Sequence, residues 1–394
     1  MIDKIKQLAQ KYASDVVDIR RHIHANPELS YQEYNTAKYV ASQLKEVGIT
    51  PKEGVAETGL TAIIEGKNPG KKVIALRADM DALPIKEAND VVYKSKNEGV
   101  MHACGHDAHT ASLLGTARIL HTLKDEFEGT VKFVFQPGEE KNPGGASLMI
   151  KDGALKNPAP TKMFGQHVMP LIPVGKVGFR PGMYMASCDE IYLTVKGKGG
   201  HGAIPELAID PVLITAHIIV ALQQIISRNA SPKTPTVLSF GKVIANGATN
   251  IIPEEVKVDG TFRAMNEEWR ADAHKRIKKM AESIAEGMGG SCEVTISKGY
   301  PYLENDPALT AEARKAAATY IGEENIVDLD LWMGAEDFSY YTHEVSACFY
   351  RLGTRNESKG ITSYVHTPTF DIDEKALEIG SGMMAWLAIN ALNN

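Results

Sequence analysis

The chain has 394 residues, of which 43% are hydrophobic and 23% are charged, and its formal net charge is −6. This composition excludes a disordered or fibrous protein, and the length predicts two domains instead of a single core. The negative charge and the lack of a long Lys/Arg cluster argue against nucleic acid as a partner. The four cysteines are widely spaced without a C-x-x-C pattern, which is typical of the reducing cytosol.

The N-terminal residues 1–23 place apolar side chains at helical spacing with charges between them. This pattern predicts an amphipathic helix and not a signal peptide. The longest apolar run, around residues 218–222, is too short to cross a bilayer. We therefore expect a soluble, cytoplasmic protein with no membrane partner.

The first part of the chain alternates helical patterns with buried-strand runs, as an α/β fold does. Candidate strands cover residues 72–78, 131–136 and 161–165, and each leads into polar residues. These polar residues are Asp79 and Asp81, then Glu139 and Glu140, and then His167. Because ligands of open α/β sheets gather outside the carboxyl ends of the strands, we expect these side chains to converge.

The middle of the chain has a different pattern. Strands are predicted over residues 190–196, 236–243, 255–264 and 292–297, and helices over residues 210–228 and from Asn266 onward. Asp210 and Pro211 suit the N-cap and first position of the first of these helices. The order βαββαβ predicts a ferredoxin-like α+β sandwich, in which two helices cover one sheet.

After about residue 299 the chain returns to helices and polar-tipped strands, ending in a predicted helix over residues 374–392. His366 lies in this last part, so it reaches Cys104 only if the C-terminal segment completes the first domain. We therefore predict an α/β catalytic domain of residues 1–187 and 299–394, a mixed open sheet flanked by helices. Residues 188–298 are inserted into it as a lid or dimerisation domain.

The most informative stretch is residues 100–109, which hold one thiol and three imidazoles. A Cys-x-His pair such as Cys104 and His106 can reach one metal ion from a single turn. Together with Glu140, His167 and His366 it offers thiolate, imidazole and carboxylate ligands, the mixture expected for Zn, Mn or Co. Each residue alone is more often structural, but their coincidence at strand ends favours a metal site.

Glu139 and Glu140 are adjacent, so one carboxylate can bind metal while the other contacts a water molecule. A metal ion lowers the pKa of bound water from about 15.7 to about 7, and a nearby carboxylate can take and deliver its proton. This pattern indicates Glu139 as a general base. Asp81 can orient an imidazole ligand, or equally well cap the turn after its strand.

The inserted domain carries a second set of candidates. His201 lies in a glycine-rich loop that follows an edge-type strand, although a plain flexible turn has the same composition. Asn250 precedes a strand whose parity places Arg263 on the face opposite the apolar residues. Arginine presents a rigid fork to a carboxylate, but an ordinary solvated arginine explains this position as well.

The ordered motifs of the chain resemble those of the M20 metallopeptidases, in particular the branch of aminoacylases, hippurate hydrolases and auxin-conjugate hydrolases. The resemblance covers nearly the whole chain. Its motifs are RxxHxxPEL from Arg21, RADMDALP from Arg77, MHACGHD from Met101, QPxEE from Gln136, GHGA from Gly200, NIIP from Asn250, GAEDF from Gly334, and His366.

The resemblance implies a metal-dependent exopeptidase fold with two divalent ions per subunit, Mn before Zn or Co. It places Cys104 where many relatives have a bridging aspartate, Glu139 at the general base and Asp81 beside the metals. It further implies that His201, Asn250 and Arg263 hold the substrate's carboxylate or the developing oxyanion. His201 would come from the partner subunit of a homodimer, or a higher oligomer, formed through the inserted domain.

These residues predict a metal-dependent amidohydrolase that acts on N-acyl amino acids and releases a carboxylic acid and a free amino acid. A dipeptidase or an N-acetyl-diaminopimelate deacetylase would use the same chemistry. A non-catalytic, metal-stabilised binder of acylated amino acids is the alternative from another class. Glu139 argues against that binder, because binding alone needs no base. Departures from the family pattern at Gly138, Lys141 and Glu206 leave the substrate preference open.

Overall fold

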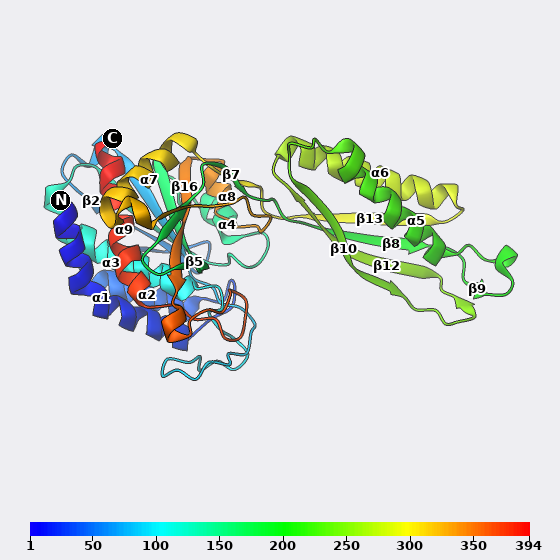
Figure 1. The fold of residues 1–394 in the computed structure, drawn as a ribbon, viewed down its shortest axis with the longest axis horizontal. Coiled ribbons are helices and arrows are strands. Elements are labelled where there is room, and N and C mark those ends of the chain that lie inside the picture. Colours follow the sequence, from blue (N-terminus) through cyan, green and yellow to red (C-terminus); the bar gives the residue numbers. More distant parts are fainter. The chain divides into compact units, whose positions relative to one another are not determined.

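The computed structural model describes all 394 residues, which divide into two compact units (Figure 1). The first unit comprises Met1–Tyr184, Glu304–Leu331 and Asp337–Asn394, and the second comprises Met185–Leu303 and Trp332–Glu336. The sequence did not predict that the short segment Trp332–Glu336 belongs with the inserted unit. The chain passes between the units at β7 (Gly182–Met185) and β14 (Leu303–Asn305), which pair with each other, and again on either side of Trp332–Glu336.

The first unit is built on an eight-stranded mixed sheet in the order β1-β2-β4-β3-β5-β16-β6-β15. The strands are β1 (Lys52–Val55), β2 (Gly59–Glu65), β3 (Val73–Asp79), β4 (Thr130–Gln136), β5 (Lys162–Pro173), β6 (Val177–Phe179), β15 (Ile326–Asp328) and β16 (Ser346–Arg355). The four central strands β4, β3, β5 and β16 are parallel to one another. All residues of β3 and β4 are buried, as expected for parallel strands covered on both faces.

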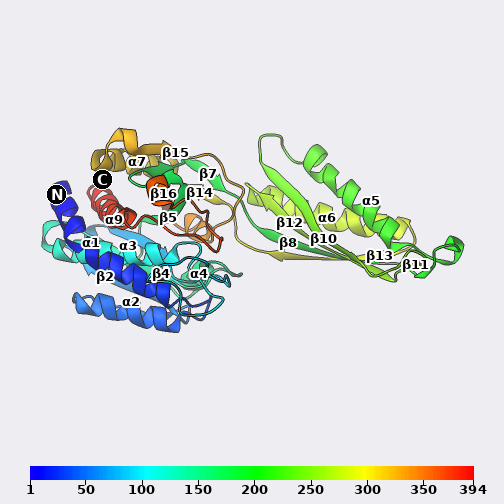
Figure 2. The same ribbon diagram turned by 60° about the horizontal axis from the view of Figure 1, so that its bottom comes forward.

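Helices cover both faces of this sheet (Figures 1 and 2). They are α1 (Ile2–Ala25), α2 (Tyr34–Glu46), α3 (His106–Thr122), α4 (Gly145–Lys151), α7 (Pro307–Ile321), α8 (Ser339–Thr342) and α9 (Lys375–Asn393). Helices α3 and α9 pack on the central strands, and α1 packs across both of them. Buried side chains such as Val16, Leu114, Phe133 and Leu387 join in one core. The predicted α/β sheet flanked by helices is confirmed.

Two strands of this sheet differ from the sequence prediction. β5 continues to Pro173, so His167 lies inside a strand and not after its end. The sequence did not locate β16, although it pairs with both β5 and β6 in the sheet. The sequence did not indicate a buried strand here because β16 contains Arg351, and a charged residue in a strand normally indicates an exposed face. Arg351 is buried in the structure. Here its guanidinium is buried and donates to the Tyr184 hydroxyl oxygen at 2.7 Å.

The second unit is a four-stranded antiparallel sheet in the order β10-β12-β8-β13, with two helices. Its main elements are β8 (Asp189–Lys196), α5 (Pro211–Gln224), β10 (Thr236–Ala245), β12 (Glu255–Ala264), α6 (Glu267–Gly287) and β13 (Ser291–Lys298). A short pair, β9 (Gly200–His201) and β11 (Ile251–Ile252), lies outside this sheet. The element order βαββαβ and the strand order are those of the predicted ferredoxin-like sandwich. Asp210 and Asn266 cap the two helices.

The expectation that β8 is an edge strand was wrong, because β12 and β13 pair with it on either side. Its residues alternate between buried and exposed, and this alternation reports one covered face. An alternating pattern carries no information about how many neighbours a strand has. The glycine-rich loop with His201 therefore follows an internal strand of the sandwich.

One helical segment, Pro211–Asn229, is long and apolar enough to cross a membrane by length and composition alone, with a mean hydropathy of 1.4. The sequence analysis considered only uninterrupted apolar runs and therefore did not identify this helix. Uncharged polar residues such as His217 and Gln223 interrupt the run without adding charge. Ile214, Ile218 and Leu222 pack into the core of the sandwich. Only 33% of the apolar window is buried, and a single such helix is weak evidence of a membrane span. The cytoplasmic location stays a prediction.

A buried ion pair between Arg270 of α6 and Asp189 of β8 joins the helix to the sheet of the second unit. Asp189 accepts hydrogen bonds from Arg270 Nε at 2.8 Å and from the Gly299 N–H at 3.1 Å. Burial opposes ionisation of Asp189, but Arg270 and His274 lower its pKa to about 2. Both partners of the pair are almost fully buried, so loss of one partner leaves an uncompensated charge.

We expect Asp189→Asn to lower the free energy of unfolding by about 3–5 kcal/mol, the cost of stripping a buried charge of its partner. In the unfolded chain this carboxyl has a pKa of about 3.9. Its stabilising effect is therefore complete above that pH and is lost as the pH falls through the folded value of about 2. Urea unfolding at neutral and acid pH measures both effects. Asp272→Asn, which removes the exposed pair with Arg276, should cost less than about 1 kcal/mol.

Candidate metal centre

The carboxyl ends of the parallel strands bring the predicted polar residues together. Asp79 at the end of β3 pairs with Gln136 at the end of β4, and Arg77 pairs with Gly165 of β5. Two residues beyond Gly165, His167 is level with Asp79. Glu139 and Glu140 follow β4 directly. The convergence expected from the sequence is therefore present in the first unit.

Cys104 and His106 are joined by Gly105, which has a positive φ of 84° at the N-cap of α3. A Cβ atom at this position would lie 2.5 Å from Val168 Cγ2. Only glycine combines this backbone conformation with so close a neighbour. The turn places the Cys104 thiol and the His106 imidazole in the same buried space.

The five predicted ligands form two groups that share the thiol. Cys104, His106 and His167 make one group, and Cys104, Glu140 and His366 make the other, with all ligand atoms of a group within 4.8 Å of one another. Cys104 Sγ lies 3.5 Å from His167 Nε2 and 3.3 Å from His366 Nε2. His366 Nε2 lies 3.1 Å from Glu140 Oε1. If each group held a divalent ion, the Cys104 thiolate would be a ligand available to both.

The imidazoles are oriented with a ring nitrogen toward this space. His106 Nδ1 lies 3.1 Å from Asp81 Oδ1, while its buried Nε2 has no hydrogen-bond partner. His167 Nδ1 donates to its neighbour's carbonyl, Val168 O, at 2.7 Å, which turns Nε2 toward Cys104. An unpaired buried nitrogen is costly unless something binds it. The residues present therefore fit a divalent metal ion.

Electrostatics favour positive charge in the centre. Burial lowers the pKa of His106, but Asp79 and Asp81 overcome it and raise the pKa to about 10. Burial and the charges of Glu140 and Glu139 raise the pKa of the Cys104 thiol well above its usual range. Proteins hold a thiolate in such surroundings with the help of a cation. The group of side chains thus binds either protons or metal ions.

Glu139 lies beside the two ligand groups that share Cys104, and it forms a further candidate group with His106 and Glu140. It is buried, with Oε2 3.9 Å from His106 Nε2. Its Oε1 accepts from the Asp337 N–H at 3.4 Å. The preceding Gly138 has a positive φ of 58°, and its N–H donates to Glu33 Oε1 at 2.8 Å. Both adjacent carboxylates come near His106, since Glu140 Oε1 lies 4.0 Å from the same Nε2.

Asp81 contacts both the His106 ring and the backbone of the turn that carries Glu139 and Glu140. Its Oδ2 accepts from Ser30 Oγ at 2.6 Å and from the Glu140 N–H at 3.0 Å. Burial alone would raise the pKa of Asp81, but hydrogen bonds, first of all from His106, lower it. Of the two interpretations left open by the sequence, this geometry favours the orientation of an imidazole.

Sequence reasoning assigned no role to His109 or Glu33. His109 Nδ1 lies 2.6 Å from Asp79 Oδ1, and its Nε2 accepts from the Val168 N–H at 2.9 Å. Both ring nitrogens are thus engaged beside His167, so His109 supports the centre and does not bind metal. The spacing from His106 on one helix was the available signal for His109, whereas nothing near Glu33 in the sequence indicated its contact with Gly138.

The three predicted substrate-binding residues all lie in the second unit. His201 pairs with Ile251 across the short strands β9 and β11, and the Gly202 N–H donates to Asn250 O at 2.8 Å. Arg263 lies near the far end of β12, with Nε donating to Thr261 Oγ1 at 3.1 Å. The structure brings His201 and Asn250 together and leaves Arg263 at the opposite end of the sheet.

Thiol, imidazole and carboxylate ligands around one buried space, with a further carboxylate beside them, are the parts of a metal-dependent hydrolase. A comparison with known families agrees. The family model described as peptidase family M20/M25/M40 matches residues 75–390, and the chain belongs to this family. It is a hydrolase with a metal-binding site.

Similar proteins include several hydrolases. Thermostable carboxypeptidase 2 of Saccharolobus solfataricus is 40% identical over 100% of this chain and 99% of its own length. N-acetylcysteine deacetylase of Bacillus subtilis is 39% identical over 96% and 97%. IAA-amino acid hydrolase ILR1-like 4 of Arabidopsis thaliana is 38% identical over 96% and 86%. Among solved structures, a Bacillus subtilis protein described as a dinuclear metal binding peptidase from the M20 family is 35% identical. It superposes with a TM-score of 0.84 over 98% of this chain and 99% of that one.

Proposed function

We propose that this protein hydrolyses the amide bond of N-acyl amino acids and releases a carboxylic acid and a free amino acid. The observation that carries the proposal is the buried Glu139 carboxylate beside two groups of metal ligands. A protein that only bound acylated amino acids would need no base there. The deacetylase and the IAA-amino acid hydrolase among its relatives support an acylated amino acid as the substrate.

In this proposal two divalent ions would be held by Cys104, His106, Glu140, His167 and His366. We expect Mn as the metal, with Zn or Co as the alternatives. Such ions supply a Lewis acid for the amide carbonyl and lower the pKa of the attacking water. Glu139 takes the proton of that water and delivers it to the nitrogen of the leaving amine. Asp81 keeps the His106 ring oriented, because its carboxylate accepts from Nδ1.

We further propose that His201, Asn250 and Arg263 bind the substrate's carboxylate or the developing oxyanion. Along β12, Arg263 is eight residues from Glu255, which pairs with Lys196 near the loop of His201. At about 3.3 Å per residue this separates the two ends by roughly 26 Å. His201 and Arg263 of one chain cannot both contact one small substrate. This supports a homodimer, or a higher oligomer, in which His201 comes from the partner subunit.

A substrate panel tests the proposed reaction. N-acetyl and N-benzoyl amino acids, N-acetyl-diaminopimelate and unblocked dipeptides are offered to the purified protein with and without added Mn, Zn or Co. We expect the protein to hydrolyse the N-acyl amino acids only when metal is present. The free amine that is released measures the turnover. Metal analysis of the same preparation identifies the bound ion. Turnover of none of the acylated compounds, with metal bound, would contradict the proposal.

A dipeptidase or carboxypeptidase is the second candidate, and a specific observation favours it. The thermostable carboxypeptidase of Saccharolobus solfataricus is as similar to this chain as the deacetylase is. Both reactions cleave an amide next to a free carboxylate, so Arg263 suits either substrate. The same panel separates them, because a peptidase turns over the unblocked dipeptides faster than the N-acyl compounds.

Mixing two inactive variants tests the origin of His201. We expect Glu139→Gln and His201→Ala each to be inactive alone, and activity to return after their subunits exchange. A mixed dimer has one site with Glu139 and the partner's intact His201, whereas its other site carries both defects. With statistical pairing, half of the dimers are mixed, so about a quarter of the wild-type activity returns. A mixture that stays inactive despite demonstrated exchange would assign His201 to its own subunit's site, or to no site.

A further inference from the structure

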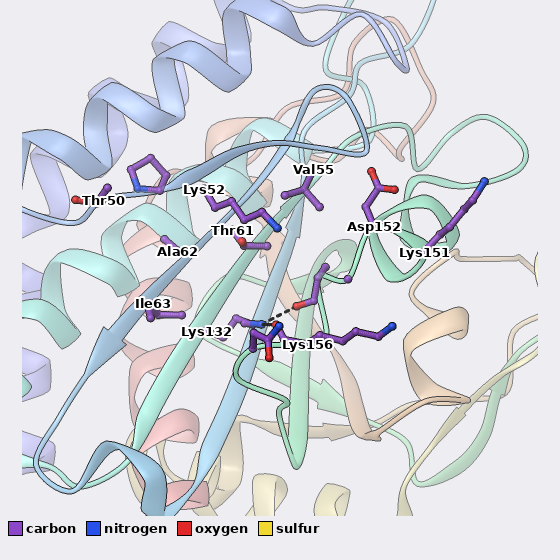
Figure 3. Close-up of a pocket in the computed structure, with 14 residues that line it drawn as sticks. Thr50, Lys52, Val55, Thr61, Ala62, Ile63, Lys132, Lys151, Asp152 and Lys156 are labelled. Carbon is purple, nitrogen blue, oxygen red and sulfur yellow. Dashed lines mark hydrogen bonds between the residues drawn. The ribbon is translucent and has the colours of Figure 1, made fainter.

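A cavity of about 650 Å³ opens on the first unit and shares no lining residue with the candidate metal centre (Figure 3). Strands β1, β2 and β4 form its floor, and the segment after α4 forms its rim. Its size lies within the range of about 300–1,000 Å³ that is usual for small-molecule sites. The proposed hydrolysis gives this cavity no role.

Strand register places the residues of the floor on one face of the sheet. Lys52 pairs with Thr61, and Ile63 pairs with Lys132. Directly paired residues, and residues two apart on a strand, point to the same side. Lys52, Thr61, Ile63 and Lys132 therefore share one face, while residues of opposite parity, such as Phe133, enter the core.

Lys132 is a buried cation without an acidic partner. The residue is 3% exposed, and its Nζ donates to Ala154 O at 2.9 Å and to Lys156 O at 2.7 Å. An ammonium group has three hydrogens, so one donor is left. Burial and the charge of Lys52 lower the pKa of Lys132 to about 8. Buried charges in proteins are normally paired, which makes an unpaired one informative.

The other charges around the cavity are also mainly positive. The lining contains the four lysines Lys52, Lys132, Lys151 and Lys156, and a single carboxylate, Asp152. That carboxylate accepts from the Ala56 N–H at 2.8 Å. Lys52 is close enough for its charge to lower the pKa of Lys132, and Figure 3 shows both lysines among the residues that line the cavity. The whole chain has a net charge of −6, but the excess of positive charge around the cavity attracts an anion locally.

Apolar side chains lie beside these ammonium groups. Pro51, Val55 and Ile63 all line the cavity, and Ile63 remains 40% exposed although it lies on a strand. Pro51 and Val55 are buried, so a bare inorganic ion would leave mainly the Ile63 side chain in contact with water. A ligand with an apolar body would cover it and gain from the burial.

We propose that the cavity binds a small organic anion, a molecule with an apolar body and one carboxylate or phosphate group. The negative group pairs with Lys52 and with the remaining donor of Lys132, and the body lies against Val55 and Ile63. This site is separate from the proposed hydrolysis, so either assignment can hold without the other.

Isothermal titration calorimetry of the full-length protein at low salt tests this site. The probes are benzoate, phenyl phosphate, inorganic phosphate and the neutral benzyl alcohol. We expect saturable binding of benzoate or phenyl phosphate and none of benzyl alcohol, and the tighter of the two anions identifies the head group. Lys52→Glu should weaken that binding by about tenfold or more, because it removes a charged hydrogen-bond donor. Lys38→Glu, an equal charge change at an exposed position of α2 outside the cavity, should leave it unchanged.

A second variant tests the apolar wall. Ile63→Ser is expected to weaken phenyl phosphate more than inorganic phosphate, since only the former has a body to cover. Binding of neither organic anion to the wild-type protein would overturn the proposal. So would equal effects of Lys52→Glu and Lys38→Glu, which would mean that the anion binds elsewhere, including at the metal centre.

Discussion

The Glu139→Gln variant is expected to keep its metal and to lose about 10²–10⁴ in kcat, the usual contribution of a positioned acid–base group. The amide has the size of the carboxylate but cannot take a proton from water. Its effect on metal should be small, because Glu139 belongs to neither of the two ligand groups that share Cys104. Steady-state kinetics on the best substrate, with metal analysis of the same sample, measure both quantities.

Glu140→Gln is the matched control, since it makes the same chemical change one residue further on. Glu140 Oε1 lies 3.1 Å from His366 Nε2, in the group that includes Cys104. This variant should lose metal affinity first and activity as a result, so that excess metal restores part of its turnover. If both variants lost metal equally and neither was selectively slow, Glu139 would not be the base.

Cys104→Ala is expected to lose bound metal and activity together while the protein stays folded. Cys104 belongs to both groups of candidate ligands, so its removal weakens each of them. The large apolar core of the first unit does not depend on this one thiol. Metal content, kcat and circular dichroism are the measurements. Cys348→Ala, a change at another buried cysteine, should retain the metal. Full metal content in Cys104→Ala would exclude Cys104 from the site.

The same residue predicts a dependence on pH. Binding as thiolate requires loss of the thiol proton, and burial with Glu140 and Glu139 nearby raises the pKa of that thiol. Protons therefore compete with metal more strongly as the pH falls, and metal occupancy should decrease toward acid pH. Cys104→Asp offers a carboxylate, which titrates far lower than a thiol. It should hold its metal to a lower pH than the wild-type protein does.

The sequence located part of the candidate metal centre because several of its residues follow strands. Asp79, Asp81 and the pair Glu139 and Glu140 come directly after runs with the composition of buried strands. Parallel strands end at one edge of a sheet, so even without coordinates these residues were expected to meet. The short spacing of Cys104 and His106 added ligands that a single turn can bring together.

Other parts depended on contacts that no local pattern records. The strand β16 contains a buried arginine, and its position between β5 and β6 is set by tertiary pairing. His366 has a positive φ of 62°, and its N–H donates to Ala103 O at 2.7 Å, more than 260 residues away in the chain. The lysines of the cavity are unremarkable in the sequence, because only the strand register shows that Lys52 and Lys132 share a face.

The order of the strands has a consequence for synthesis of the protein on the ribosome. β16 lies between β5 and β6 in the sheet, yet it is made last of the eight strands. The sandwich is nearly continuous in sequence, so a growing chain can fold it before the larger sheet is complete. Until β16 emerges, β5 and β6 expose edges that could pair with other chains. A nascent chain held before residue 346 should therefore depend on chaperones far more than the finished protein does.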